Sequence, residues 1–306
     1  MKFVFQIDPI NTLNPNSDTS LQLIREACRR GEAYFFTPDN LFWCDGQVQA
    51  IAQKINFMQE DYSLSDKQIV NLAEMDVIFV RQNPPYDMNY LTSTYLLDKI
   101  STQVLIINNP KAIRDFPEKL AVLDYLEFIP PTLISSCVEK AKEFAKNHEK
   151  VILKPLYSFA GNDIFCVDAQ DINFSNIFHN LLHIYKAPVI VQKFIEGIIH
   201  GDKRILLVDG DPIGGFVRMP KENDIRANLV FGGEALACEL TARDLEICAA
   251  LKPRLKKSGL FLVGIDIIDG YLTEINVTSP TGIMLIQKFY DQKIVEKIFD
   301  KIAKSA

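Results

Sequence analysis

Two apolar runs of seven residues, Leu262–Ile268 and Tyr271–Val277, stand near the carboxyl end of the chain. Asp269-Gly270 separates them, and each run has the length of a buried strand. Asp-Gly between two such runs is a strong signal for a β-hairpin, because both residues tolerate the left-handed backbone of a tight turn. The sequence therefore predicts a buried antiparallel hairpin against which the neighbouring chain must pack.

Three polar residues interrupt this apolar hairpin: Asp266, Glu274 and Asn276. Glu274 and Asn276 are two residues apart, so they project from one face of their strand, and the sequence shows no obvious cationic partner for them. Two carboxylates and an amide oxygen are hard ligands that suit magnesium, with nucleotide phosphates completing its coordination. An exposed strand face with ordinary acidic residues explains the hairpin alone equally well.

The geometry of the turn decides whether Asp266 belongs with the other two. A plain two-residue turn pairs Asp266 with Thr273 and places its side chain on the face opposite Glu274. Asp266 joins the site only if the loop has an odd length or a bulge shifts the register.

The first third of the chain alternates short apolar runs with a helical segment, as α/β proteins do. A helix is predicted over residues 20–30, ending at Gly31, and Pro117-Glu118-Lys119 suits the start of another. The other predicted helices span 138–147 and 286–303. Strands are predicted at 3–7, 33–36, 75–80, 104–108, 151–154, 164–167, 189–194, 204–208 and 215–219.

Two lysines stand where an anion would compensate their charge. Lys154 ends the buried run 151–153, and Lys119 lies at the expected helix start, whose amides favour anions. Phosphate is one candidate, although each lysine alone is more often solvated. The strand end Gln192–Glu196 offers backbone groups and an apolar wall to an adenine, which is a weak signal by itself.

Basic side chains gather in the second half of the chain. Arg218 ends an apolar strand, where its guanidinium fork could take a substrate carboxylate. Residues 221–233 are interpreted as a loop that orders over a ligand, with plain surface charge as the alternative for each basic residue. The cluster comprises Lys203, Arg204, Arg218, Lys221 and Arg226, followed by Asn228 and Gly232-Gly233.

Composition argues against several classes of function. The net charge is −6 and no run of Lys or Arg exceeds two, so the basic stripe of a nucleic-acid-binding protein is missing. No apolar run approaches the roughly 18 residues that span a bilayer, and the apolar start is too short for a signal peptide. The six cysteines show no metal-binding spacing and are expected to be free thiols in a reducing cytosol.

The phosphate-binding lysines, the strand end, the arginines and the carboxylate–amide strand follow the order used by the ATP-grasp fold. Six strings then resemble bacterial glutathione synthetase, over about residues 3–300. They are Asp8-Pro9-Ile10, 81–87 (RQNPPYD), 114–120 (RDFPEKL), 152–156 (ILKPL), 201–204 (GDKR) and 274–281 (EINVTSPT). The Pro-Pro string and the last string are specific to that family rather than to ATP-grasp enzymes at large.

The resemblance implies an α/β (α+β) chain with an ATP-grasp fold in three domains. Residues 1–117 would form a parallel α/β substrate-binding domain, 118–193 a central lid domain, and 194–306 a catalytic domain with an antiparallel sheet. It implies a ligase that uses ATP and Mg²⁺, with Mn²⁺ as the alternative metal, to join γ-glutamylcysteine to glycine through an acyl phosphate. The implied protein is cytoplasmic and homo-oligomeric, with small-molecule partners, no nucleic acid and no membrane.

The resemblance also implies roles for individual residues. Arg204, Arg226 and Lys154 would act on the transferring phosphoryl group, and Asp266, Glu274 and Asn276 would hold the metal. The nucleotide would contact Lys119, Lys154, Tyr157, Ser158, Phe159, Ala160, Gly161, Gln192, Lys193, Phe194, Ile195, Glu196 and His200. The dipeptide would contact Asp8, Pro9, Ile10, Arg218, Asn228, Gly232, Gly233, Ser279, Pro280 and Thr281.

The chain departs from the family's pattern at three places. The phosphate-covering loop, residues 157–163, keeps only Gly161 where the family usually has several glycines, so we expect a mobile loop and weaker ATP binding. His200 replaces an aspartate usual near the ribose, with Glu196 as a compensating carboxylate. Residues 234–237 lack a common arginine–glycine pair. Two alternatives therefore stay open: another ATP-grasp ligase for a different acid and amine, and a catalytically weakened nucleotide-binding protein.

Overall fold

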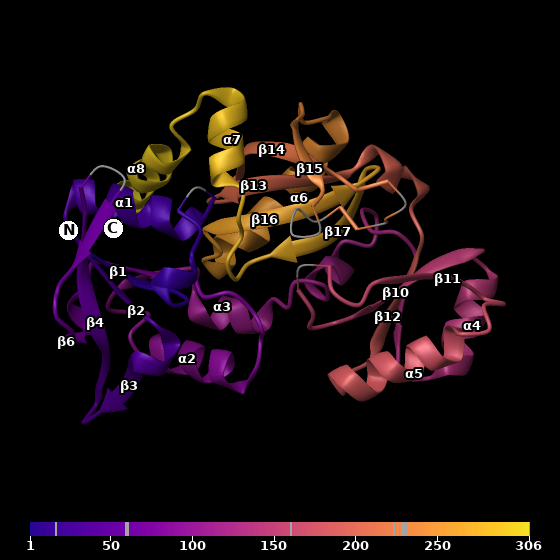
Figure 1. The fold of residues 1–306 in the computed structure, drawn as a ribbon, viewed down its shortest axis with the longest axis horizontal. Coiled ribbons are helices and arrows are strands. Elements are labelled where there is room, and N and C mark those ends of the chain that lie inside the picture. The colour runs from indigo at the N-terminus through magenta and orange to yellow at the C-terminus, as the bar shows by residue number, and fades with distance from the viewer. Residues whose placement is uncertain are drawn as a thin grey trace.

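The described residues form three β-sheets, which the computed structural model places side by side (Figure 1). These residues are 1–15, 17–58, 61–159, 161–222, 224, 226–227 and 232–305. The first sheet has eight strands, the second four and the third five. The mixed α/β architecture expected from the sequence is confirmed.

The first sheet contains a parallel part built from strands that the sequence predicts. Its order is β2-β1-β7-β8, and all three pairings are parallel. The elements are β1 (Lys2–Gln6), α1 (Thr19–Arg30), β2 (Glu32–Phe36), β7 (Val77–Val80) and β8 (Leu105–Ile107). The Asp18 side chain caps the first turn of α1, and Gly31 follows its last turn. Because the strands are parallel, the carboxyl ends of β1 and β7 meet at one edge of the sheet.

The same sheet continues into an antiparallel extension that the apolar periodicity does not predict. β4 pairs with β2 and also with β3, β5 and β6. Their bounds are β3 (Leu41–Cys44), β4 (Gln47–Met58), β5 (Asp61–Leu64) and β6 (Gln68–Asn71). In the first half of β4, alternate residues such as Val48, Ala50 and Ala52 are buried. Asp45-Gly46 makes the turn before it, with φ of 49° and 83°, so an Asp-Gly signal is present here too.

The second sheet is antiparallel throughout, in the order β11-β10-β12-β9. Its elements are β9 (Thr132–Ser135), α4 (Val138–Lys146), β10 (Lys150–Pro155), β11 (Phe165–Asp168), α5 (Phe174–Tyr185) and β12 (Val189–Lys193). The two helices cover one face, where Val151, Leu153 and Phe178 belong to a separate core. Strand alternation therefore turns Ile152 and Lys154 to the opposite face.

The third sheet is also antiparallel, in the order β15-β14-β13-β16-β17. Its elements are β13 (Asp202–Val208), β14 (Asp211–Met219), β15 (Glu234–Ala237), α6 (Ala242–Ser258), β16 (Leu262–Ile268) and β17 (Tyr271–Asn276). α6 begins at a capping box and packs Ile247 and Leu251 on one face of the sheet. On the other face of β13, Leu206 and Val208 enter a core shared with the first sheet, and Arg204 lies on this same face.

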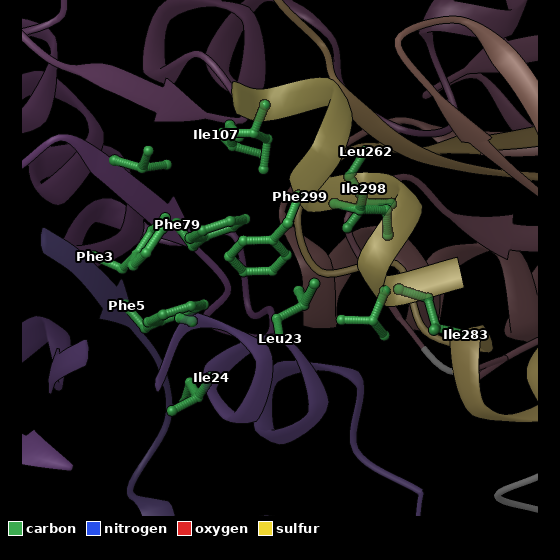
Figure 2. Packing of buried hydrophobic residues seen from close by; sticks show 14 of the residues in the cluster. Phe3, Phe5, Leu23, Ile24, Phe79, Ile107, Leu262, Ile283, Ile298 and Phe299 are labelled. Carbon is green, nitrogen blue, oxygen red and sulfur yellow. The ribbon is translucent and has the colours of Figure 1, made fainter. Parts of the chain in front are cut away.

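The last two helices join the third sheet to the first. α7 (Ile283–Tyr290) and α8 (Ile294–Ser305) are separated at Asp291, whose left-handed backbone (φ 47°) ends the first of them. The single helix expected over 286–303 is therefore wrong. Phe299 of α8 packs on Phe3 and Phe79, with ring centroids 5.4 and 5.7 Å apart (Figure 2). Both ends of the chain consequently lie at the first sheet (Figure 1).

The helix start expected at Pro117 is a single turn, in which the Pro117 carbonyl accepts the N–H groups of Leu120 and Ala121 (2.9 Å each), and it leads into a 3-10 helix rather than an α-helix. The Glu118 carbonyl instead accepts the backbone N–H of Ile275 (3.0 Å), which ties this segment to β17. The remaining helices are η1 (Ile10–Thr12), η2 (Pro38–Asn40), η3 (Leu72–Glu74), α2 (Met88–Asp98), α3 (Pro110–Asp115), η4 (Ala121–Asp124) and η5 (Glu196–His200). Within the described residues, none of the helices has both the length and the apolar character to cross a lipid bilayer.

Candidate active site

A cavity of about 430 Å³ lies where the second and third sheets meet. β10 and β12 supply one wall, and β13, β14, β16 and β17 supply the other. Residues from distant parts of the sequence therefore converge on one site. Those expected at the site that line the cavity are Lys154, Phe159, Gly161, Gln192, Lys193, Phe194, Ile195, Arg204, Arg218, Arg226, Asp266, Glu274, Asn276, Ser279, Pro280 and Thr281.

The register of the β16–β17 hairpin brings its three polar residues to one face. The turn has two residues, Asp269-Gly270, with φ of 48° and 75°. A β-bulge then makes Thr273 an extra residue, so that Asp266 pairs directly with Glu274 instead of with Thr273. Asn276 lies two residues further on the same face. Asp266 therefore shares a face with Glu274 and Asn276 because of a bulge in the strand, and the loop keeps its two residues.

The Asp266 carboxylate is held by two arginines. Arg204 is its cross-strand neighbour and donates through Nε (2.5 Å) and NH2 (2.9 Å). Arg218 approaches Oδ1 to 3.0 Å, and the Asn276 amide donates to Oδ2 over 3.2 Å. Burial opposes ionisation of this carboxyl group, but the two guanidinium groups lower its pKa below the ordinary value. The carboxylate is therefore charged and fixed in position.

Arg218 also contacts Asp202, its cross-strand partner on β13. Burial raises the pKa of Asp202 to about 6, although Arg218 acts in the opposite direction. Burial opposes the charge of Arg218 as well, yet Asp202 and Asp266 raise its pKa. Strand pairing thus builds an alternating row of carboxylates and guanidinium groups along one wall of the cavity.

Two buried lysines stand beside this row and differ in their partners. The Lys119 ammonium donates to the carbonyl of Ser158 and lies 3.6 Å from Glu274 Oε1. The sequence shows no obvious cationic partner for Glu274, and the fold supplies one in Lys119, which is more than 150 residues away along the chain. Among the described residues, no hydrogen bond or ion pair holds the Lys154 ammonium. Burial lowers the pKa of Lys154, and the nearby charge of Lys119 adds to that effect.

The oxygen atoms of Asp266, Glu274 and Asn276 fit a hard divalent cation. They are two carboxylates and an amide on one face of a hairpin, and Mg²⁺ is commonly bound by one or two carboxylates with phosphates and water completing its octahedron. The described residues contain no group of three or more His, Cys, Asp or Glu side chains that could hold a metal ion. The donor set therefore fits a metal that arrives with a phosphorylated ligand better than a permanently caged one.

Apolar side chains that the sequence does not single out form the other half of the cavity. Ile152, Ile164, Ile198 and Ile268 line it together with Phe194, one of the residues expected to contact adenine. An apolar lining beside a cluster of cations suits a nucleotide, whose base is apolar on its faces and whose phosphates are charged. Strand alternation could have indicated Ile152, because it precedes Lys154 by two residues and so lies on the same face of β10.

Comparisons with known proteins agree with this arrangement. A model of the prokaryotic glutathione synthetase N-terminal domain matches residues 1–114, and a model of the prokaryotic glutathione synthetase ATP-grasp domain matches residues 118–291. A protein of Rhodopseudomonas palustris named glutathione synthetase is 43% identical over 306 residues, covering 99% of this chain and 98% of that protein. The chain belongs to the prokaryotic glutathione synthetase family. A glutathione synthetase of Synechocystis is 36% identical and covers 97% and 98%.

Solved structures give the fold of this family member. D-cycloserine synthetase superposes with a TM-score of 0.69 at 14% identity, covering 99% of both chains. A RimK domain ATP-grasp protein from Sphaerobacter thermophilus gives 0.64 at 16% identity and covers 98% of both. The ATP-grasp fold is thus confirmed, and the chain is an ATP-dependent ligase that uses a divalent metal.

Several residues that the family resemblance implied do not line the cavity. Tyr157 and Ser158 border a small adjacent pocket, and Glu196 borders a separate polar pocket. Asp8 accepts the backbone N–H of Asn83 (3.0 Å), and Asn83 itself lines the cavity. Lys119, Pro9, Ile10, His200, Gly232 and Gly233 are also absent from the described lining. Ala160 and Asn228 lie outside the described residues.

Some residues that line the cavity lie within the strings shared with the family but were not assigned a role from the sequence. Glu118 and Thr278 meet there, and Thr278 Oγ1 donates to Glu118 Oε1 over 2.8 Å. Burial raises the pKa of Glu118, and Lys119 partly offsets this rise. Asn83 and Pro84 bring the first sheet to the site. Strand pairing marks Asp202, because it faces Arg218 across the β13–β14 ladder.

Proposed function

We propose that the chain joins the cysteinyl carboxylate of γ-glutamylcysteine to the amine of glycine, converting ATP to ADP and phosphate. The observation that carries this proposal is that Lys154 and the Asp266–Glu274–Asn276 face line one cavity, with Lys119 at 3.6 Å from Glu274. Buried cations without enough acceptors beside hard oxygen donors fit the phosphates and metal of ATP. Membership of the family supports the choice of the acid and the amine.

In the first proposed step, a carboxylate oxygen of the dipeptide attacks the γ-phosphorus. The bond from that phosphorus to the bridging oxygen breaks, ADP leaves, and an acyl phosphate forms. Lys154 is positioned to neutralise charge on the phosphates, and Arg204 and Arg226 are positioned to meet the transferring group. Asp266, Glu274 and Asn276 would hold Mg²⁺, or Mn²⁺ as the alternative, which when bound screens and orients the phosphates.

In the second proposed step, the amine of glycine attacks the acyl carbon. The carbon–oxygen bond to phosphate breaks, phosphate leaves, and the amine gives up a proton to solvent. Ser279, Pro280 and Thr281 lie in the wall of the cavity and would orient the dipeptide beside Arg218. An enclosed site protects the acyl phosphate from water, which would otherwise hydrolyse it.

Phosphate release from ATP tests the proposal, with γ-glutamylcysteine and glycine each omitted in turn. Full turnover should need both substrates, and glutathione should form in equal amount to phosphate. Turnover with another acid and amine, but not with this pair, would favour a different ligase. ATP binding without phosphate release under any combination would favour a weakened nucleotide-binding protein.

We further propose that the protein works in the cytoplasm as a homo-oligomer. All six cysteines are free thiols, as expected in a reducing compartment. The family resemblance supports self-association. Light scattering on the purified protein measures the subunit number, and a monomeric mass at micromolar concentration would contradict the oligomer.

A further inference from the structure

Arg81 occupies an unusual place at the edge of the first sheet. It follows β7 directly, and its backbone N–H donates to the Gln6 carbonyl (2.8 Å), which continues the parallel ladder past the end of both strands. Its side chain is 3% exposed. A full guanidinium group is therefore buried at the carboxyl ends of β1 and β7, where ligands of parallel sheets usually bind.

The contacts of Arg81 reach across most of the chain. Its NH2 group donates to the Pro280 carbonyl (3.0 Å), and its own carbonyl accepts the Ser279 hydroxyl (3.1 Å). Its Nε donates to Ser20 Oγ at the start of α1 over 3.3 Å. Main chain and side chain of one residue thus hold the same dipeptide, Ser279-Pro280, from two sides.

The hydrogen bonds of Arg81 do not offset the free-energy cost of burying its charge. Among the described residues no carboxylate forms an ion pair with Arg81, and its NH1 group is buried without a hydrogen-bond partner. Burial lowers the pKa of Arg81 to about 10, although the more distant Asp18 raises it. A buried charge with neutral partners and an unused donor is destabilising relative to an apolar side chain of similar size. A role in positioning the Ser279-Pro280 segment would explain why a guanidinium group is buried here.

The loop that Arg81 holds belongs to the wall of the active site. Ser279, Pro280 and Thr281 line the cavity immediately after β17, and Asn83 and Pro84 line it two and three residues after Arg81. We propose that Arg81 is a positioning residue that fixes these two stretches relative to each other and so shapes the subsite for the acid substrate. This inference rests on the proposed function, because that function assigns the acid substrate to this wall.

Loss of the Arg81 contacts should affect the binding of γ-glutamylcysteine but not the binding of ATP. The proposed nucleotide side of the cavity is built by β10 and β12, with Lys154 and Gln192. The described hydrogen bonds of Arg81 go to other elements. Arg81→Met should therefore raise KM for γ-glutamylcysteine tenfold or more, since small misplacements of positioning groups cost up to about a hundredfold. KM for ATP should change less than about twofold. Arg81→Lys, which keeps one donor but not the fork, should give an intermediate KM.

Arg114→Met is the matched control. Arg114 is a partly buried arginine, with its side chain 10% exposed, that has a carboxylate partner, Asp98 at 2.6 Å, and does not line the cavity. Its loss should lower Tm while leaving both KM values unchanged. Hydrogen exchange of the peptide spanning residues 277–282 supplies a readout that needs no substrate: it should rise in Arg81→Met and stay at the wild-type rate in Arg114→Met.

If Arg81→Met does not fold, Arg81→Lys and Ser279→Ala, which removes the hydroxyl contact, carry the same measurements. Equal rises in both KM values, or wild-type KM values with unchanged exchange in residues 277–282, would overturn the positioning role. A wild-type protein that ignores γ-glutamylcysteine contradicts the proposed function instead. The exchange comparison then still decides whether Arg81 holds the loop.

Discussion

The floor and the cover of the active site are built in different ways. The floor is the face of β13, β14, β16 and β17, where Arg204, Arg218 and Asp266 are buried and hold one another through strand pairing. The cover is the loop 157–163, in which Tyr157 and Phe159 are 44% and 41% exposed. The floor also belongs to a sheet that shares a core with the first sheet, whereas the second sheet has its own.

Two tethers hold the described part of the cover. Lys119 donates to the Ser158 carbonyl, and the Tyr185 hydroxyl donates to Asp163. Asp163 is thus hydrogen-bonded to Tyr185 and does not line the cavity. From this difference we expect substitutions in the floor to change the chemical step and substitutions in the cover to change the affinity for the nucleotide. Substitutions in the two regions should separate these effects.

The largest expected effect is in the floor, at Glu274. Glu274→Gln keeps the shape of the side chain but removes the charge that pairs with Lys119 and that we propose binds the metal. Ligation should fall by more than about a hundredfold, because loss of a group that merely supports a metal ligand already costs about ten- to a hundredfold. Phosphate release measures the loss, and calorimetry should show that much of the ATP binding remains.

Glu246→Gln is the control for this variant, because Glu246 is an exposed residue of α6 that pairs only with its helical neighbour Arg243 in the described structure. Its turnover should equal that of the wild type. If the proposal holds, Glu274→Gln should not show near-normal ligation together with a normal melting curve. That result would mean that Glu274 does not bind the metal and that the floor does not control the chemical step through this residue.

Lys154 should show opposite effects on activity and stability. Lys154→Met should lower kcat by about a hundredfold, the loss typical of one group that stabilises developing charge. It should also raise the free energy of unfolding by about 1 kcal/mol or more, because it removes a buried charge without a partner among the described residues. Denaturant unfolding at pH 7 measures the gain, and a loss of stability would show that Lys154 has a partner.

The stability gain from Lys154→Met should shrink as pH rises. Burial lowers the folded-state pKa of Lys154 below the usual 10.5, so between the folded pKa and 10.5 the unfolded chain binds the proton and the folded chain does not. Wild-type stability relative to the variant therefore rises with pH across that window. Unfolding curves of both proteins at stepwise higher pH test this, and a constant difference would contradict the assigned direction.

Lys119 should behave in the opposite sense to Lys154, because it joins the floor to the cover. Lys119→Met loses the contacts to Ser158 and Glu274, so the free energy of unfolding should fall by about 1–3 kcal/mol. KM for ATP should rise, since the loop loses a tether. Parallel unfolding of the two methionine variants is the measurement, and shifts of the same sign would show that the two lysines are equivalent.

The sequence predicted the fold where local signals and burial agree. The strands from Phe3 onward, the helix ended by Gly31 and the Asp269-Gly270 hairpin appear within a few residues of their expected bounds. β4 was missed because much of its buried face consists of small residues such as Ala50 and Ala52. The turn at Pro117 does not continue as an α-helix, and the Glu118 carbonyl bonds to a strand more than 150 residues away. Contacts of that separation leave no mark in a local pattern.

The site was predictable in its residue types but not in its pairings. Asp266, Glu274 and Asn276 could be named from charge inside an apolar hairpin, yet the bulge at Thr273 that unites them is set by the three-dimensional ladder. Likewise, Arg218 carried a sequence signal, but its two carboxylate partners follow from the order of the strands. The type of each side chain can be read from the sequence, whereas its ion-pair partner depends on the order of the strands in the sheet.

The smallest expected effect is in the cover, at Ser158. Backbone amides approach phosphates most closely where glycine leaves room, and Ser158 restricts the loop at a position whose carbonyl is already tied to Lys119. Ser158→Gly should lower KM for ATP by at most about tenfold, the equivalent of one hydrogen bond to a charged group at the low end of about 1.5–3 kcal/mol. KM for γ-glutamylcysteine should not change, because its proposed subsite lies on the other wall.

Ser136→Gly separates this effect from the general cost of a glycine. Ser136 is an exposed loop residue before α4 on the same sheet, so its replacement should lower stability by a similar amount through the unfolded chain without changing either KM. Steady-state kinetics of both variants with ATP varied at saturating γ-glutamylcysteine and glycine give the comparison. An unchanged or raised KM for ATP in Ser158→Gly, beside an unchanged control, would mean that the glycine-poor loop already holds the phosphates fully, and the cover would then be as fixed as the floor.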